Sequence, residues 1–338
     1  MTTTASRTLG SWTFVLVLAA CNTPAVDAPD AGVPTDACVR RDVGNDADAG
    51  DAGPGPGLPA VTNGTTSNPT AEAANYGCLG TVSAPPPGAT ISYGVELRGL
   101  GSGEPVAAAR IWFLPDNRVT TTCTGSCVEV TTDASGNGTM SGPSGAWLAY
   151  RVFPRSGSTM ATTFVGSFGV NTVAPTVAGG VVTARAVSVS TRNLIPAAFG
   201  FTRVPTTAMA VGAVRDCDGE AVRGAIIRLF QSDGTELVSD RSVNDAPHIQ
   251  YFDGNGNPDG TTVFTQVDGL YAGANVPPPA TGLADVRAEA WGVRSAGGPL
   301  ELLGCEVVGV TSDGVSLVDI GPMRADYDPM HPCCTARH

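Results

Sequence analysis

The sequence predicts an all-β protein: two tandem β-sandwiches that follow a disordered acidic tether. The 338 residues include 43 Gly and 26 Pro, and only 15% are charged. This composition favours short strands and tight turns over helical bundles. In addition, short apolar runs alternate with Gly-Glu, Asp-Gly and Pro-Gly turns, and two stretches of the chain are similar to each other. Such self-similarity indicates a duplicated module.

The first 20 residues have the three parts of a cleaved export signal. Arg7 precedes the apolar run from Trp12 to Leu18, which is too short to span a bilayer as a helix. Small residues then lead to Cys21, and the segment resembles the bacterial lipobox. This resemblance implies a diacylglyceryl group on Cys21, and Asn22 after it favours the outer membrane. An ordinary secretory signal with a nearby cysteine is the alternative.

The composition of residues 21–75 predicts a tether. Aspartates alternate here with Ala, Gly and Pro, and large apolar residues are few. Such a segment buries too little apolar surface to offset the entropy lost on ordering. We therefore expect it to be disordered and to hold the folded part away from the bilayer.

The similar stretches each contain a strand, a Gly-Glu turn and a second strand with an apolar core face. In the first unit these are Tyr93–Gly99 and the segment Gly103–Leu114; in the second they are Val211–Asp216 and the segment Gly219–Phe230. A later Asp-Gly or Asp-x-x-Gly turn leads in both units to Pro and a further strand.

This order of strands and turns resembles the carboxypeptidase regulatory-like domain, a transthyretin-like β-sandwich of seven strands. The resemblance covers about 89–190 and 207–325, and it is better in the second unit, with Asp216-Cys-Asp-Gly219 and Asp268-Gly-Leu-Tyr271. It implies an accessory module that carries no catalytic residues. The whole arrangement also resembles lipoproteins of large-genome myxobacteria. The predicted organisation is a signal peptide (1–20), a tether (21–75), a first sandwich (76–200), a second sandwich (201–325) and a Cys/His-containing tail (326–338).

Nine cysteines leave eight for disulfides once Cys21 carries lipid. Cys123 and Cys127 enclose a short turn and are expected to pair. Cys217 and Cys305 fall in one predicted unit and are the next expected pair. The remaining four cysteines allow two arrangements. Either Cys333 and Cys334 each clamp another segment, for example Cys38 and Cys78, or they form a vicinal bridge.

One loop has the residue types of a calcium site. Oxygen-bearing side chains occupy every second position, with glycines between them, at Asp253, Asn255, Asn257 and Asp259. The twelfth position is Phe264 rather than the Glu of an EF-hand, and Asp268 is a ligand only if the chain folds back. A polar turn is the alternative interpretation. A zinc site can also be written from His331, Cys333, Cys334 and His338, although the spacing is cramped.

Composition excludes several functions. All 19 basic residues are arginines, which rules out P-loop, Schiff-base and Ser-Lys chemistry. The net charge of −12 argues against nucleic acid and anionic lipid surfaces. Only three histidines are present, and no nucleophile or metalloprotease motif is found. We expect no enzyme and no cofactor apart from calcium. Trp112, Trp147 and Trp291 are either core residues or stacking platforms for sugars.

The sequence therefore predicts a non-catalytic outer-membrane lipoprotein, facing the periplasm or the surface. Its partners would be the bilayer, through Cys21, and an envelope protein or glycan that binds loops or a sheet edge. A calcium-stabilised adhesion protein and an accessory module of an extracellular hydrolase system are the alternatives.

Overall fold

Strands make up almost all the regular structure of the protein. The computed structural model describes residues 75–120, 122–125, 127–159, 162–294, 300–327 and 331–333. Fifteen strands and one helix occur within these residues, so the all-β prediction is confirmed. The predicted signal peptide, Cys21 and nearly all of the tether lie outside the described residues.

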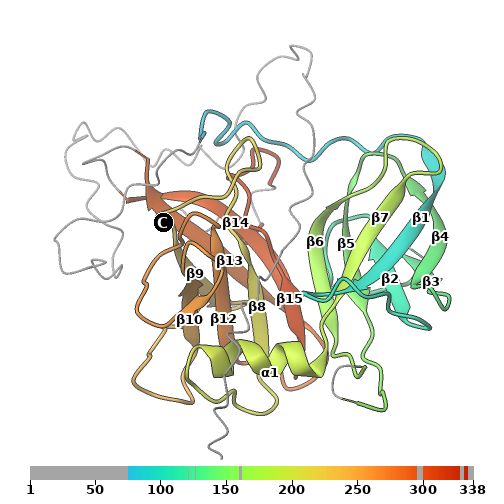
Figure 1. Ribbon diagram of the computed structural model, residues 1–338. Helices are drawn as coiled ribbons and strands as arrows, with labels where there is room; N and C mark the ends of the chain where they lie inside the picture. The colour runs from blue at the N-terminus through green and yellow to red at the C-terminus, as the bar shows by residue number, and fades with distance from the viewer. Residues whose placement is uncertain are drawn as a thin grey trace, which may run out of the picture.

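The first sandwich packs two sheets over one core (Figure 1). Its three-stranded sheet has the order β4-β1-β7, and its other sheet has the order β6-β5-β2-β3. Apolar side chains alternate along each strand, so Leu97, Ile111 and Phe113 meet between the sheets and are fully buried. Burial of each such side chain stabilises the fold by about 1.5–3 kcal/mol. The strands are β1 (Thr90–Gly99), β2 (Arg110–Leu114), β3 (Val128–Thr131), β4 (Asn137–Pro143), β5 (Trp147–Val152), β6 (Ser167–Val173) and β7 (Val181–Ala186).

The second sandwich has the same plan. Its sheets have the orders β11-β10-β12-β8-β15 and β14-β13-β9, and Leu229, Tyr271 and Leu303 lie in its core. The strands are β8 (Ala208–Ala213), β9 (Ile226–Gln231), β10 (His248–Phe252), β11 (Pro258–Asp259), β12 (Leu270–Val276), β13 (Ala284–Val293), β14 (Leu300–Val310) and β15 (Val315–Leu317).

The strand order of the two units supports the duplication seen in the sequence. In the first unit β1 pairs antiparallel with β4 and parallel with β7; in the second, β8 pairs antiparallel with β12 and parallel with β15. The opposite sheets also correspond, because β2-β5-β6 matches β9-β13-β14 in order along the chain. In each set the last two strands pair with each other: β5 pairs with β6, and β13 pairs with β14.

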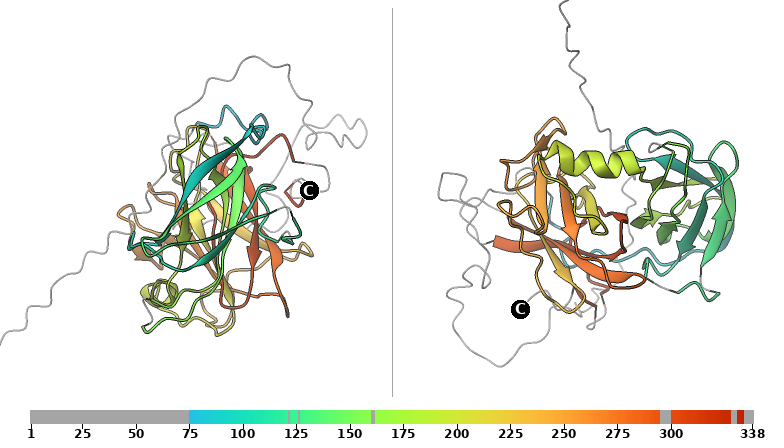
Figure 2. Two further views of the ribbon diagram at one scale, coloured as in Figure 1. Left: turned by 90° about the vertical axis from the view of Figure 1, so that its right-hand side faces the viewer. Right: turned by 90° about the horizontal axis from the view of Figure 1, so that it is seen from below.

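Within the described residues, one strand pairing joins the sandwiches. Strand β15 of the second unit pairs in parallel with β6 of the first, from Val315 opposite Ser167 to Leu317 opposite Gly169. One nine-stranded sheet therefore runs through both units, and the view from below in Figure 2 shows them side by side. Because hydrogen-bonded strands resist rotation, this pairing fixes one sandwich against the other.

The helix α1 (Val189–Ala198) links the units and was not predicted. Its β-branched residues and Pro196 favour non-helical structure. Tertiary contacts override this preference: the Ser188 hydroxyl accepts the Thr191 N–H as an N-cap, and Ile195 packs on the outer face of β8 and β12. Arg192 forms an ion pair with Asp313 at 3.1 Å. Figure 1 shows α1 across the lower end of the second sandwich.

The chain enters the described structure on the second sandwich, although the prediction assigned residue 76 onward to the first. The Asn75 amide donates to Asp216, and Cys78 is bonded to Cys217. Further on, the amide of Gly80 donates to the carbonyl of Met323. Residues 75–84 therefore brace the second unit before the chain crosses to the first.

The disulfides correct one predicted pairing. Cys123 is bonded to Cys127, as expected. The Cys217–Cys305 prediction is wrong, because Cys217 bonds to Cys78 and Cys305 to Cys333. Membership of one unit was the argument for that pair, but each cysteine instead ties a terminal segment to the sandwich. The Cys333 bond also excludes a vicinal bridge to Cys334.

Candidate functional site

The outer face of β2, β3 and β5 carries a cluster of arginine and aromatic side chains. Ile111 and Phe113 point into the core, so the alternation of a strand places Arg110 and Trp112 on the opposite side. Register then sets Trp112 opposite Glu129 on β3 and Arg151 on β5. Phe153 follows β5 and donates its backbone N–H to the carbonyl of Arg110. We call Arg110, Trp112, Glu129, Arg151 and Phe153 the arginine–aromatic face.

The rings and guanidinium groups of this face stack on one another. Trp112 and Phe153 meet edge to face, with centroids 4.7 Å apart. The Arg110 guanidinium lies 3.8 Å from the centre of the Phe153 ring, and that of Arg151 lies 5.0 Å from it. Both guanidinium groups also lie within 6 Å of the Trp112 ring. Cation–π attraction therefore holds two positive charges near each other on one sheet face.

Carboxylates do not neutralise these two arginines. The one acid of the face, Glu129, accepts the Trp112 indole N–H at 2.7 Å. Among the residues that the structure describes, neither Arg110 nor Arg151 has an ion-pair partner. The pKa of Arg151 is lowered by burial and then by the charge of Arg110. The face is thus locally positive on a protein of net charge −12.

The matching face of the second sandwich is neutralised. Arg228 occupies the position equivalent to Trp112 and forms a two-pronged ion pair with Glu236. Its Nε donates to Glu236 Oε1 at 2.8 Å, and its Nη2 donates to Oε2. Arg287 pairs with Glu289 at 2.7 Å, and Trp291 donates to the same carboxylate. Burial raises the pKa of Glu289, opposed by Trp291 and the two arginines. Each positive charge of this face therefore has a carboxylate.

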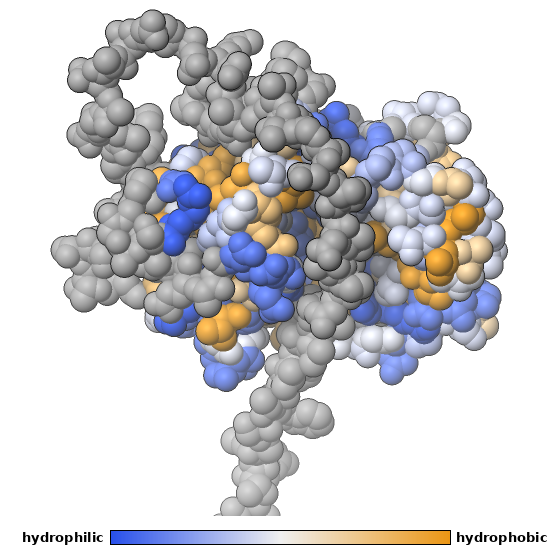
Figure 3. Space-filling model, turned by 90° about the horizontal axis from the view of Figure 1, so that it is seen from above, coloured by the Kyte–Doolittle hydropathy of each residue, from blue (hydrophilic) through white to orange (hydrophobic). Residues whose placement is uncertain are grey.

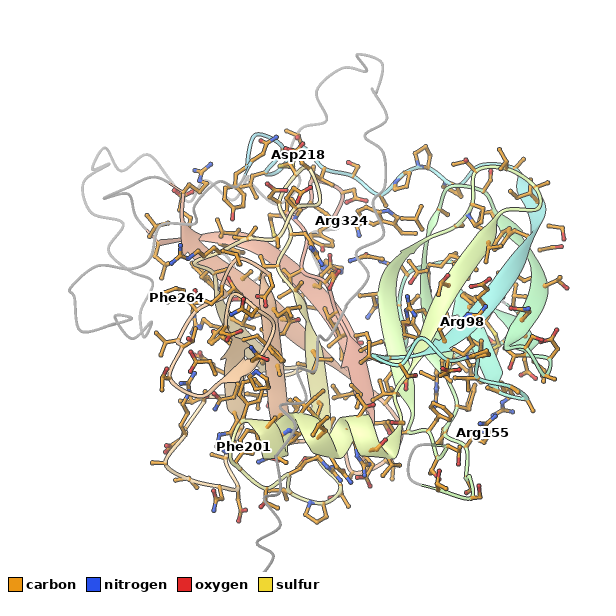
Figure 4. The ribbon with its side chains drawn as sticks, in the orientation of Figure 1. Arg98, Arg155, Phe201, Asp218, Phe264 and Arg324 are labelled. Carbon is orange, nitrogen blue, oxygen red and sulfur yellow. A yellow bond between two sulfur atoms is a disulfide. The ribbon has the colours of Figure 1, made fainter. Side chains whose placement is uncertain are left out.

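The three tryptophans of the predicted strands lie on outer faces rather than in the core. A guanidinium group contacts each ring: Arg324 lies 4.7 Å from the centre of Trp147 and Arg228 lies 5.9 Å from that of Trp291. Trp112 has both Arg110 and Arg151. Figure 4 shows Arg324 on the side of the second sandwich that faces the first. The rings thus serve as supports for arginines rather than as bare stacking platforms.

The predicted calcium loop has the geometry of a hydrogen-bonded turn. Asp253 Oδ1 accepts the backbone N–H groups of Asn255 at 2.8 Å and Asn257 at 2.9 Å. The same two-amide pattern recurs at Asp133 and Asp216, whose turns also carry oxygen-bearing side chains at every second position. A turn stabilised by an aspartate at its first position therefore accounts for the hydrogen bonds of Asp253.

The two other carboxylates of this region, those of Asp259 and Asp268, lie in different surroundings. Asp259 accepts hydroxyl groups of Thr261 and Thr262, and these bonds lower its pKa to about 2. The chain does fold back and bring Asp268 near the loop, because a Cβ placed on Gly256 would lie 4.0 Å from Asp268 Oδ2. That oxygen has no hydrogen-bond partner, and burial followed by the charge of Asp253 raises the pKa of Asp268.

Within the described part of the chain, no group of three His, Cys, Asp or Glu side chains has the arrangement of a metal site. Calcium binding at Asp253, Asn255, Asn257 and Asp259 stays a prediction. A rise in melting temperature with calcium that EDTA reverses, and that Asp253→Asn abolishes, would support it. A melting temperature that changes with neither calcium nor EDTA would contradict the prediction.

The predicted zinc cluster is overturned. Cys333 is in a disulfide with Cys305, so its sulfur is not a thiolate ligand. His331 stacks on Tyr327 with ring centres 4.0 Å apart, and the other two predicted ligands lie outside the described residues. The third histidine, His248, begins β10, is buried, and stacks on Phe201, which Figure 4 labels beside α1.

A shallow depression of about 300 Å³ lies between the β9 turn, β13, β14 and Pro332. Ser232, Asp233, Asp285 and Arg287 line it, and no histidine is among its lining residues. No described helix is long and apolar enough to cross a membrane. In the view from above, hydrophobic and hydrophilic residues are interspersed on the visible described surface (Figure 3). The arginine–aromatic face is therefore the most distinctive cluster of charge.

Sequence reasoning found Trp112 but not its neighbours. The sequence does contain a signal for this face, because Arg110 and Trp112 stand two positions apart on one strand, and Arg151 and Phe153 stand two positions apart on another. Two such rows form one face only if β2 and β5 are neighbours in this register, which the strand pattern alone does not fix.

No protein-family model matches the sequence, and no curated protein matches it. Some solved structures are similar to it. The shaft pilin SpaA from Lactobacillus rhamnosus GG has 12% identity over 69% of this chain and 98% of its own, with a TM-score of 0.22. The minor pilin GBS52 of Streptococcus agalactiae has 9% identity over 69% of this chain and 96% of its own, with a TM-score of 0.21.

The TIE protein of Bacillus anthracis has 11% identity and a TM-score of 0.21 over 69% of this chain. This chain spans only 34% of that protein. With TM-scores this low, none of these similarities carries an argument about function.

Proposed function

We propose that the protein is a non-catalytic, lipid-anchored protein of the cell envelope that binds a partner through the first sandwich. The observation that carries this function is the arginine–aromatic face, which concentrates unpaired positive charge on a rigid sheet. Such an exposed patch of charge and aromatic rings is typical of a binding surface. The depression beside Pro332 is lined by Ser232 but by no histidine that could activate it, and it offers no comparable support for catalysis.

The disulfides support an oxidising compartment. Three described pairs close loops in a protein with a predicted export signal. Disulfides of this kind persist in secreted and periplasmic proteins and are rare in the reducing cytosol. The predicted lipid on Cys21 would then place the protein at the outer membrane.

The entry point of the chain supports an orientation. The segment that follows the predicted tether is fixed on the second sandwich by the Cys78–Cys217 bond. A chain anchored at Cys21 therefore reaches the second sandwich before the first. The β15–β6 pairing makes the two units one body, so the first sandwich projects beyond the second as a rigid extension.

Fractionation of cells tests the anchor. The wild-type protein should sediment with membranes and release only with detergent, whereas Cys21→Ala should lose this detergent requirement. Asn22→Ala is a matched control at the neighbouring position and should stay with the membranes. Retention of Cys21→Ala with the membranes, at wild-type levels and with the same detergent requirement, would contradict the lipid anchor.

Crosslinking in native cells tests binding. A photoreactive side chain placed at Thr131, which lies opposite Arg110 in the β2–β3 pairing, should capture a partner. The same group at Val238, which is exposed two positions beyond Glu236 on the neutralised face of the second sandwich, is the control. Equal capture from both positions would show that the first face has no special role.

A further inference from the structure

We propose that the arginine–aromatic face binds a carboxylated polysaccharide, that is, a glycan chain bearing uronate groups. This inference rests on the proposed function, because it names the partner of the same face. The first observation is the positive charge of the face. Arg110 and Arg151 share the same two rings and repel each other, and the described structure supplies neither with a carboxylate. A bound anion would relieve that repulsion.

The stacked geometry favours carboxylates as the anionic groups. A guanidinium that covers a ring with its flat side keeps the N–H donors at its edge free. These donors form a fork that matches the two oxygens of a carboxylate. Arg110 on β2 and Arg151 on β5 present two such forks on neighbouring strands, so a polymer with repeated carboxylates can engage both.

The sheet itself favours a glycan over an acidic peptide. Strand β2 is paired with β3 and β5, and β5 is paired with β2 and β6. The backbone groups beneath the face are therefore used within the sheet. An extended peptide gains its main affinity by adding to a free strand edge, which here is the outer edge of β3 rather than β2 or β5, the strands that carry the two arginines. A polysaccharide has no peptide groups to satisfy and can lie across exposed side chains.

The second sandwich provides an internal comparison. At the equivalent positions Arg228 is paired with Glu236, and Glu289 takes the place of Arg151. A polyanion that approached that face would meet the carboxylates of Glu236 and Glu289, which already pair with the arginines. The two faces share a scaffold and differ in free positive charge, which predicts binding on the first face alone.

The test uses the full chain with Cys21→Ala, which leaves the folded part unchanged and avoids lipid. The probe is oligogalacturonate, measured by calorimetry at low and at physiological salt. Its methyl ester, which has the same sugars without charge, and polyaspartate of equal charge are the comparison ligands. We expect saturable binding of oligogalacturonate, weaker binding at higher salt, and at least tenfold weaker binding of both comparison ligands.

Variants assign the binding to the face. Arg110→Gln and Arg151→Gln should each weaken binding about tenfold, because each removes a charge-assisted contact. Arg294→Gln removes the same charge from an exposed position on the second sandwich and should bind as the parent does. Glu129→Gln removes the one acid of the face and should strengthen binding. Thermal melting of each variant checks that it is folded.

Equal binding of polyaspartate would overturn the glycan assignment, and binding unaffected by Arg110→Gln and Arg151→Gln would overturn the assignment to this face. No binding of oligogalacturonate would end the proposal. None of these results concerns the anchor, because membrane fractionation tests that separately. A protein that fractionates with membranes yet ignores oligogalacturonate would keep the proposed envelope location and lose only this ligand.

Discussion

The two sandwiches share a strand order but not an outer face. Trp112, Arg151 and Phe153 of the first unit correspond by register to Arg228, Glu289 and Trp291 of the second. In the second unit these positions form closed ion pairs; in the first they leave two arginines without a carboxylate. The comparison shows that a duplicated scaffold keeps its core pattern while the outward positions change freely. Charge on the outer face is therefore where the units diverge.

The units also differ in what braces them. The second sandwich carries residues 75–84, α1 and the segment around Cys333, and two disulfides tie terminal segments to it. The first sandwich has one described disulfide, which closes a short turn. This difference supports the proposal in which the second unit is the structural base and the first is the displayed unit. Four predictions test this contrast, from the largest expected effect on stability to the smallest.

Removal of the Cys78–Cys217 bond should destabilise the protein most. The bond spans a sequence separation of 139, so its loss frees a long loop in the unfolded chain. The chain-entropy argument gives a cost of up to about 5 kcal/mol. The Cys123–Cys127 bond spans only 4 residues, and the same argument gives about 2 kcal/mol. Paired Cys→Ala variants should be compared by denaturant unfolding. An equal loss from both pairs would mean that the second unit is not the base.

Stability should fall as pH rises through neutrality because of Glu306. This carboxyl on β14 is buried beside β6 of the first unit, and burial raises its pKa from 4.5 to about 7, opposed by Arg324 and Asn171. The folded protein thus keeps a proton that the unfolded chain releases near pH 4.5. The stabilisation is complete below pH 4.5 and is lost between pH 4.5 and 7.

The loss in this window should be on the order of 3 kcal/mol. Glu306→Gln, which stays neutral, should flatten the dependence, and unfolding free energies at pH 5 and pH 8 measure it. Glu301→Gln alters an exposed ion pair on the same strand and should leave the slope unchanged. A wild-type slope in Glu306→Gln would show that this group does not couple the units to pH.

Asp313→Asn should loosen the junction of α1 with the second sandwich. Asp313 accepts from Arg192 at 3.1 Å and Arg203 at 2.7 Å, and its φ of 59° is a conformation that Asn also tolerates. The substitution therefore removes charge without straining the backbone. Because the Asp313 side chain is 45% exposed, we expect a loss of about 1–2 kcal/mol. Asp233→Asn is the matched control in an exposed turn and should cost less. Identical unfolding curves would exclude a role for the pair.

Arg151→Glu should change binding without changing stability. It gives the first face the charge pattern of the second, since Glu289 is the equivalent residue. We expect loss of oligogalacturonate binding, because a carboxylate then neutralises Arg110. Stability should stay within about 0.5 kcal/mol, because the ion pair gained with Arg110 offsets the cation–π contacts that Arg151 makes with Trp112 and Phe153. Calorimetry and thermal melting on one sample measure both. Retained binding would show that free positive charge is not what distinguishes the faces.

Particular residues show why some features were predictable. The alternation of Ile111 and Phe113 with polar neighbours, and the Asp-x-x-Gly turns, are local signals, so strands and duplication could be read from the chain. The helix α1 could not, because Ile195 is held by contacts to Met209 and Phe252 that are distant in sequence. The Cys217–Cys305 prediction was wrong for the same reason: its true partners come from segments whose paths no local pattern describes.

The sequence by itself determined the all-β class, the repeated unit, the short Cys123–Cys127 bridge and the absence of lysine chemistry, because period, turn residues and composition are local properties. It also predicted the anchor and tether, which stay predictions. Only the tertiary structure decided that β15 pairs with β6, that residues 75–84 brace the second sandwich, and that Arg110 and Arg151 share one face. These features depend on which strands become neighbours, and long-range pairing is set by the packing of the whole chain rather than by any single segment.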